Sequence, residues 1–146
     1  MPLGSGAALG VVAVATALVF AALSALHLFW AVRGIGSGSA ALPQRGGTSL
    51  FVPGRLSTLV VALLLALAVV VVLQRVSLGP ALLPAGLVPV ASWTLTTVMI
   101  LRAVGDFRYI GFFKRVRDTR FATLDTRFFS PIALMLGLGA GWGALS

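Results

Sequence analysis

Four long apolar stretches alternate with polar connections along the chain, and they predict four membrane-spanning helices. The stretches cover residues 7–32, 56–73, 82–104 and 130–145. Each is close to the roughly 20 residues that an α-helix needs to cross the hydrocarbon core of a bilayer. The sequence therefore predicts an all-α fold, a polytopic four-transmembrane-helix bundle in which residues 1–146 form a single integral membrane domain. No basic residue precedes the first stretch, so it is expected to stay in the protein rather than be cleaved as a signal peptide.

Prolines mark the predicted starts of the last two helices. Pro80, Pro84 and Pro89 stand before or within the third stretch, so its helix is expected to start late or to kink near Pro89. Ser130 followed by Pro131 is a frequent helix start, with a hydroxyl that caps free backbone amides and a proline in the first turn. The fourth helix is therefore predicted to begin at Ser130.

Basic residues gather in the first and third connections, residues 33–55 and 105–129. With the arginine at residue 102, this side of the predicted bundle holds ten of the eleven cations, and the other side holds only Arg75. Positively charged connections are retained in the cytoplasm. We therefore expect a multi-pass protein of the inner, cytoplasmic membrane, with both connections in the cytoplasm and both termini outside.

Small residues recur on the first and last apolar stretches. Alanines occupy every fourth position from Ala13 through Ala17 and Ala21 to Ala25, and glycines stand at residues 137, 139, 141 and 143. Such rows let helix backbones approach closely. They predict helix contacts inside the bundle, and a homo-oligomer or membrane partner that docks through Gly137, Gly141, Ala13, Ala17 and Ala21.

The third connection combines charge, aromatic residues and a short repeat. Asp-Thr-Arg-Phe at residues 118–121 recurs at residues 125–128, and an apolar stripe of helical spacing crosses residues 109–116. This pattern predicts an amphipathic helix in the lipid headgroup region, between the third and fourth spans. The cations expected to contact anionic lipid headgroups are Lys114, Arg115, Arg117 and Arg120. An ordinary positively charged loop with aromatic anchors is the alternative.

A candidate pocket is predicted on the same cytoplasmic side, from His27, Trp30, Arg102, Asp106, Arg108 and Tyr109. His27 lies inside the apolar zone, where an ionisable side chain is a functional candidate. Arg102 and Asp106 have the i, i+4 spacing of an ion pair on one helix face. The alternatives are a neutral His27 that bonds Thr96 or Thr97, and a charge pair that only neutralises a helix end.

The amino-acid composition excludes several kinds of catalytic and metal-binding chemistry. The chain is 59% hydrophobic and has no cysteine, one histidine and three acidic residues, which excludes disulfides, thiolate catalysis and cysteine metal sites. It shows no catalytic serine–histidine–carboxylate set, no metal-ligand cluster and no phosphate-binding loop. We therefore expect no cofactor, no metal and no catalytic residue. The net charge of +8 does not predict nucleic-acid binding, because the cations border apolar stretches.

Two motifs carry a resemblance to a known family. HLFWAVRGIG at residues 27–36 and LRAVGDFRYIGFFKRVRDTRFATLDTRFFSP at residues 101–131 resemble the motifs of the bacterial membrane family known as domain of unknown function 3995. The resemblance implies a small four-span protein and implies no particular activity.

Two classes of function fit these observations. The first is a non-catalytic membrane module that binds anionic lipid or a partner subunit through its basic cytoplasmic face. The second is a small transporter or membrane enzyme with a cytoplasmic-side pocket around His27, Arg102, Asp106 and Tyr109. An enclosed cavity bounded by those four side chains would favour the second class.

Overall fold

The protein is described by a computed structural model that covers residues 4–36 and 39–146. Its elements, in order, are α1 (Gly4–Arg33), β1 (Gln44–Arg45), β2 (Thr48–Ser49), α2 (Arg55–Arg75), α3 (Val88–Val104), α4 (Arg120–Leu124), the π-helical turn η1 (Asp125–Phe129) and α5 (Ser130–Leu145). The two short strands pair antiparallel, with Gln44 opposite Ser49. The predicted all-α fold is confirmed, apart from this small hairpin in the first connection.

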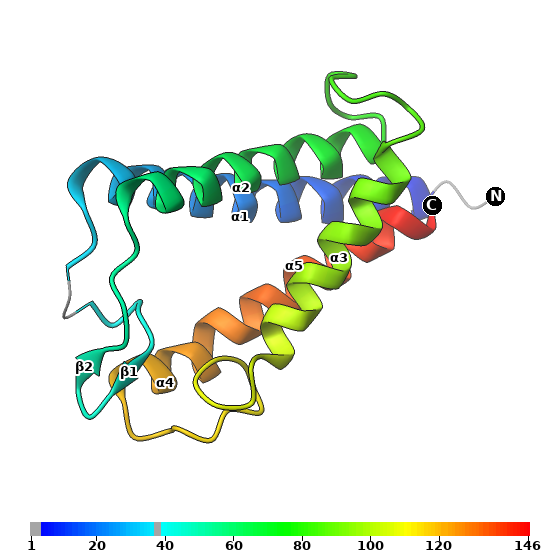
Figure 1. Cartoon of the computed structure of the whole chain (residues 1–146). Coiled ribbons are helices and arrows are strands. Elements are labelled where there is room, and N and C mark those ends of the chain that lie inside the picture. The colour runs from blue at the N-terminus through cyan, green and yellow to red at the C-terminus, as the bar shows by residue number, and fades with distance from the viewer. Residues whose placement is uncertain (1–3, 37–38) are drawn as a thin grey trace.

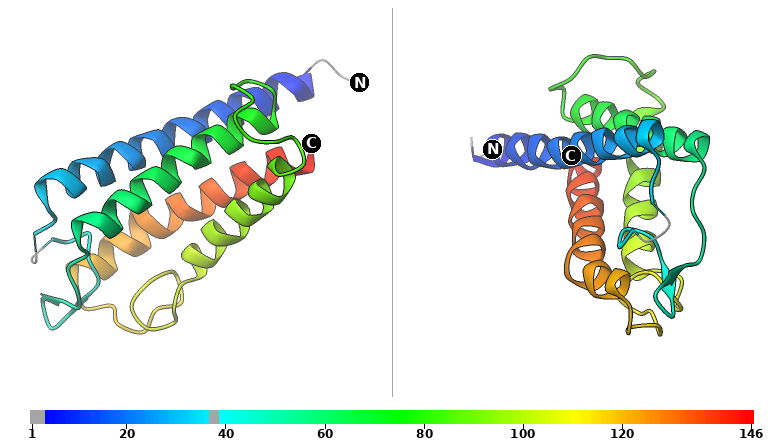
Figure 2. Two further views of the ribbon diagram at one scale, coloured as in Figure 1. Left: turned by 45° about the horizontal axis from the view of Figure 1, so that its top comes forward. Right: turned by 90° about the vertical axis from the view of Figure 1, so that its left-hand side faces the viewer.

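The helices form two pairs, α1 with α2 and α3 with α5 (Figure 1). The pairs meet near the end that holds Gly4 and the C-terminus and diverge toward the other end, and they cross at an angle (Figure 2). At the diverging end the β1–β2 hairpin packs against α4. The first and third connections therefore lie at the same end of the molecule, as the sequence predicts.

Small side chains from three helices form the core. Ala13, Ala17 and Phe20 of α1 pack with α2 and α5, where the buried members are Ala68, Val72, Leu136 and Ala140. Burial of Ala13 and Ala17 confirms half of the predicted alanine row, but Ala21 and Ala25 are exposed. A strict i, i+4 row rotates by about 40° per step on a helix of 3.6 residues per turn, and so leaves the contact face. Ser24 continues that face instead and donates to the Ala62 carbonyl at 2.8 Å.

The glycines of α5 contact three different helices. A Cβ added at Gly137 would meet Ile100 of α3, and one added at Gly141 would meet Thr96 of the same helix. A Cβ at Gly139 would collide with Thr16 of α1, and one at Gly143 would meet Val76 just beyond α2. All four glycines are buried. The predicted close packing of this helix is therefore confirmed inside the chain, while docking of a second copy through the same residues stays a prediction.

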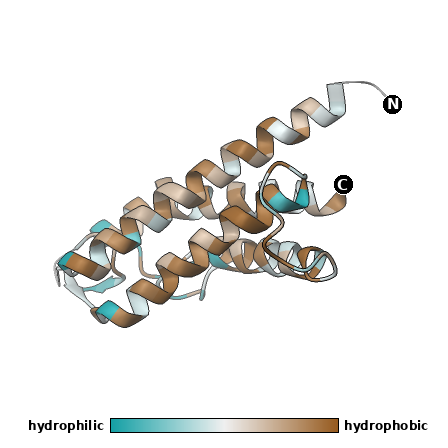
Figure 3. Ribbon diagram, turned by 90° about the horizontal axis from the view of Figure 1, so that it is seen from above, coloured by the Kyte–Doolittle hydropathy of each residue, from teal (hydrophilic) through white to brown (hydrophobic). Residues whose placement is uncertain are grey.

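Among the residues that the structure describes, three helical segments are long and apolar enough to cross a membrane: Gly4–Arg33, Arg55–Arg75 and Arg120–Leu145. The helix Val88–Val104 is apolar but shorter. Hydrophobic residues make up much of the length of the helices (Figure 3). Many of their side chains are exposed, and those more than half exposed include Val11, Leu18, Leu63, Val90, Leu101 and Met135. Outward-facing apolar helices of this length are typical of membrane proteins.

The third helix starts late, as its prolines predict, whereas the predicted start of the last helix is wrong. The third helix begins at Val88, within the stretch 82–104, because the prolines keep the preceding chain out of the helix and Pro89 occupies the first turn. The last helix does not begin at Ser130, because α4, η1 and α5 follow one another without a break. Its N-cap is Thr119, whose hydroxyl accepts from the Ala122 amide at 3.1 Å, and the Ser130 amide instead donates to the Asp125 carbonyl in the π turn.

Candidate functional site

The connection between α3 and α4, residues 105–119, is an ordered loop and not the predicted amphipathic helix. Gly105 and Gly111 have φ angles of 92° and 88°, which residues with a Cβ rarely adopt. The backbone around the two glycines is also tightly packed. A Cβ added at Gly105 would collide with the Ile110 carbonyl, and a Cβ added at Gly111 would collide with the Val104 carbonyl. The backbone therefore closes on itself here, and this interrupts the apolar stripe that predicts a helix.

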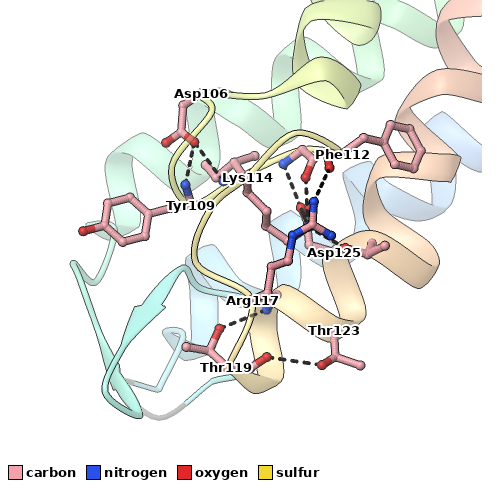
Figure 4. Close-up of polar contacts among 12 residues, drawn as sticks. Asp106, Tyr109, Phe112, Lys114, Arg117, Thr119, Thr123 and Asp125 are labelled. Atoms are coloured by element: carbon pink, nitrogen blue, oxygen red, sulfur yellow. Dashed lines mark hydrogen bonds and ion pairs between the residues drawn. The ribbon is translucent and has the colours of Figure 1, made fainter.

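Asp106 holds the tip of this loop. Its Oδ1 accepts from the backbone amides of Arg108 at 2.9 Å, Tyr109 at 2.7 Å and Ile110 at 2.9 Å (Figure 4). Partial burial favours the protonated acid and is the largest single influence on its pKa, but the three amide bonds together outweigh it and hold the pKa of Asp106 below its ordinary value. The ionised carboxylate therefore holds the loop tip more strongly than the protonated acid does.

Beneath the loop, Asp125 is the centre of a buried ion cluster. Its Oδ1 accepts from Arg102 Nη2 at 2.8 Å, and its Oδ2 accepts from Lys114 Nζ at 2.9 Å and from the Gly111 amide at 2.8 Å. The Asp125 side chain is fully buried. One carboxylate on η1 thus fixes the end of α3 and both halves of the loop, and a π-helical turn often accompanies such specialised positions.

Lys114, expected at the lipid headgroups, is buried in this cluster with 1% of its surface exposed. Besides Asp125, its ammonium donates to the Gly111 carbonyl at 2.9 Å and to Thr126 Oγ1 at 2.7 Å. Three donated bonds satisfy an ammonium group completely. The sequence interpretation of Lys114 as a headgroup contact is therefore wrong, whereas Arg115, Arg117 and Arg120 are exposed.

The predicted pair of Arg102 with Asp106 does not form. α3 ends at Val104 and Gly105 turns the chain, so Asp106 leaves the helix face that the i, i+4 spacing requires. Arg102 pairs with Asp125, which the sequence interpretation did not include in the candidate pocket. One signal was available, because Asp125 is the acidic residue nearest the last apolar stretch, where an unpaired charge is costly.

Aromatic and basic side chains are exposed on the same loop and on the helical segments α4 and η1 that follow it. We call this surface the basic rim and define it by the exposed residues Phe107, Arg108, Phe113, Arg115, Arg117, Arg120, Arg127 and Phe128. Phe107, Phe113 and Phe128 are 58%, 60% and 55% exposed. The rings of Phe107 and Phe113 lie 6.3 Å apart, and the Arg108 guanidinium lies over the Tyr109 ring at 5.2 Å.

His27 and Trp30 lie elsewhere, in a cavity of about 170 Å³ walled by α1, the first connection and α2. His27 Nδ1 bonds the Leu23 carbonyl at 2.8 Å, not a threonine of α3. Thr96 and Thr97 donate to carbonyls of their own helix. The six predicted pocket residues therefore fall into two groups: His27 with Trp30 beside α2, and Arg102, Asp106, Arg108 and Tyr109 in and beneath the loop.

The carboxylates at the centre of this site are bonded within the chain. The Asp125 oxygens are occupied by two cations and an amide, and one Asp106 oxygen holds three amides. Within residues 4–36 and 39–146, no group of three or more metal-binding side chains occurs. What the site presents outward is a fixed surface of arginine and phenylalanine.

Helices long and apolar enough to span a bilayer, with charge confined mostly to their ends, define a helical membrane protein. The chain belongs to the family described as protein of unknown function (DUF3995), whose sequence model matches residues 20–140. This confirms the resemblance that the two motifs carry. No curated protein and no solved structure matches the chain.

The loop tip should respond to acid. Because the pKa of Asp106 is lowered in the folded loop, its contribution is complete above the ordinary value of 3.8 and is lost as the pH falls through the lowered pKa. We expect the amide protons of Arg108, Tyr109 and Ile110 to shift together, by NMR, only below pH 3.8. Asp106→Asn keeps an oxygen acceptor and should abolish this titration; a wild-type transition at or above the ordinary value would contradict the assignment.

Proposed function

We propose that the protein crosses the membrane four times, with α3 as the third span. Its 17 residues extend about 25 Å at a rise of 1.5 Å per residue, which is at the short end of the range for spanning helices. It packs along α5, the C-terminal part of the continuous helical segment Arg120–Leu145, which is long enough to span, and this supports the same placement. A three-span chain would put the two basic connections on opposite sides of the membrane.

The basic end of the bundle faces the cytoplasm in this proposal. The first and third connections lie together beside the β1–β2 hairpin and α4, and with the adjoining helix ends they carry ten of the eleven cations. The remaining cation, Arg75, lies at the other end and donates to the Ala144 carbonyl at 3.2 Å. The positive-inside rule then puts both termini outside.

At this face the protein acts as a non-catalytic module that binds anionic lipid through the basic rim. The observation that carries this proposal is that exposed phenylalanines alternate with exposed arginines on a loop already fixed from beneath by Asp125. Phenylalanine rings enter the boundary between headgroups and acyl chains, while guanidinium groups bind the phosphates beside them. Because the loop is ordered beforehand, little conformational entropy is lost on binding.

The competing function, a transporter or enzyme pocket around His27, Arg102, Asp106 and Tyr109, gains no comparable support from the contacts. Arg102 is bonded to Asp125, and Asp106 is bonded to the loop backbone. A partner helix or a second copy remains part of the proposal, with Ala21 as its first contact. Ala21 is exposed, whereas Ala13, Ala17, Gly137 and Gly141 are buried within the chain.

Lipid retention tests the proposal. The triple variant Arg115→Gln/Arg117→Gln/Arg120→Gln removes three rim cations, each worth about 1 kcal/mol near an anionic surface before salt screening. We expect the preference for phosphatidylglycerol over phosphatidylcholine, measured by native mass spectrometry, to fall by on the order of tenfold or more.

The matched control is Arg33→Gln/Arg45→Gln/Arg55→Gln, which removes the same charge from the same end but outside the rim. It should keep most of the preference, because these arginines have no neighbouring phenylalanine of the rim. Equal retention of the two lipids by the wild type would refute lipid binding, and equal losses in both triple variants would refute the rim as its location.

A further inference from the structure

A second site, independent of the basic rim, lies in the cavity beside His27. Its described lining residues are His27, Trp30, Ile35, Ala41, Leu42, Pro53, Ser57, Thr58 and Val61. Most of these side chains are apolar, so His27, Ser57 and Thr58, together with the indole of Trp30, determine what the cavity can bind. Its volume of about 170 Å³ is well below the 300–1,000 Å³ of sites for drug-sized ligands, so it has room only for a small group.

His27, Ser57 and Thr58 each donate a hydrogen bond to a backbone carbonyl of their own chain. His27 Nδ1 lies 2.8 Å from the Leu23 carbonyl. A carbonyl can only accept, so Nδ1 carries a hydrogen, and Nε2 is the ring nitrogen that can offer a lone pair. Ser57 and Thr58 both donate their hydroxyl hydrogens to the Gly54 carbonyl, at 2.8 and 2.9 Å. All three groups can therefore offer an acceptor to a ligand.

An aromatic surface adjoins these acceptors. The Trp30 ring meets the His27 ring edge to face, with centroids 5.2 Å apart, and both rings line the cavity. The face of an indole attracts cations, more strongly than the faces of other aromatic side chains. Three acceptors beside the face of an indole match a small group that is cationic and carries several N–H bonds.

We propose that this cavity binds a primary ammonium group, the end of an ethanolamine phospholipid headgroup. His27 Nε2, Ser57 Oγ and Thr58 Oγ1 accept its hydrogens, and Trp30 packs against its charge. The exposed Arg33 and Arg55 end α1 and begin α2, the two helices that wall the cavity. Two arginines would repel a free amine but suit the phosphate that adjoins the ammonium of a phospholipid.

The single histidine of the chain gives this proposal a direct readout. The protein is reconstituted in nanodiscs of phosphatidylcholine, with or without phosphatidylethanolamine, and the imidazole ¹⁵N signals of His27 are recorded. Both zwitterionic headgroups end in a cationic nitrogen, but only that of ethanolamine carries N–H donors. We expect Nδ1 to be the protonated nitrogen throughout, and the Nε2 signal to move only when phosphatidylethanolamine is present. A further sample with free ethanolamine in phosphatidylcholine nanodiscs separates a soluble amine from a lipid.

Two variants link the signal to the acceptors. His27→Leu and Ser57→Ala should each lower the retention of phosphatidylethanolamine over phosphatidylcholine by about tenfold, the usual effect of losing one hydrogen bond to a charged group. Ser57 is exposed, so its variant should fold even if the histidine variant does not. Thr97→Ala is the control, because Thr97 also bonds its own helix but lies on α3, outside this cavity.

The outcomes separate the possibilities. A shift with free ethanolamine as large as that with the lipid would keep the ammonium site and overturn its assignment to a phospholipid. An Nε2 signal that shifts with neither amine, or an unchanged retention of phosphatidylethanolamine by the Ser57→Ala protein, would overturn the site itself. Neither result depends on the anionic-lipid preference of the basic rim, which phosphatidylglycerol measures separately.

Discussion

Replacing Asp125 with asparagine is expected to destabilise the protein by about 3–5 kcal/mol, the usual cost of removing one partner from a buried ion pair. The substitution keeps the shape of the side chain and removes the charge that neutralises Lys114 and Arg102. The unpaired charge of Lys114 would contribute more to this loss than that of Arg102, because the Lys114 side chain is fully buried whereas that of Arg102 is 34% exposed. Thermal unfolding in detergent, followed by circular dichroism, measures the loss.

The repeated sequence supplies a matched control for this substitution. Asp118 begins the other copy of Asp-Thr-Arg-Phe, but it is exposed, so Asp118→Asn should change stability by no more than about 0.5 kcal/mol. Adding Lys114→Met to Asp125→Asn should restore part of the stability, because it removes the unpaired buried charge. Equal effects of the two asparagine substitutions, or no recovery in the double variant, would show that the ion cluster does not hold the loop.

Gly139→Ala is expected to destabilise the bundle by about 1–3 kcal/mol, because the added methyl group must enter an occupied space. Its Cβ would collide with Thr16 Oγ1 and would lie 3.3 Å from both Cβ and Cγ2 of the same threonine. Rotation of the threonine side chain cannot relieve all of these contacts, and Thr16 is buried between α1 and α5. The α1–α5 contact must therefore open.

Gly143→Ala adds the same methyl group to the same helix and is the control. The nearest atom to its Cβ would be Val76 Cγ1 at 3.7 Å, an ordinary contact. Alanine is favoured over glycine in a helix by about 1 kcal/mol, so this variant should be neutral or more stable. Thermal unfolding of the two variants decides, and a Gly139→Ala protein as stable as Gly143→Ala would contradict the packing of α5 on α1.

Hydropathy was sufficient to predict the helices but not the site. Apolar stretches predict α1 and α2 to within three residues at either end, and glycine spacing predicts the close packing of α5, because both depend on local pattern. The same local patterns did not predict the start of the last helix. Ser130 has the sequence of a cap, yet the helix already runs from Arg120, capped by Thr119.

The ion cluster was not predictable because it joins residues far apart in the sequence. Lys114 lies eleven positions from Asp125, and Arg102 lies twenty-three positions from it, so no helical spacing relates them. A local pattern treats Lys114 as one cation in a basic run. Gly111, within the apolar stripe of the loop, was the one sequence signal against a helix there, because glycine is unfavourable in helix interiors.

Accessibility of the loop from the two sides of the membrane tests the central claim, that the basic rim faces the cytoplasm. The chain has no cysteine, so Asp118→Cys in the loop and Leu78→Cys in the connection between α2 and α3 each introduce one thiol, both at exposed positions. A membrane-impermeant maleimide should label the Leu78→Cys protein in intact cells and the Asp118→Cys protein only after permeabilisation. Labelling of the Asp118→Cys protein in intact cells, with the Leu78→Cys protein protected, would contradict the account.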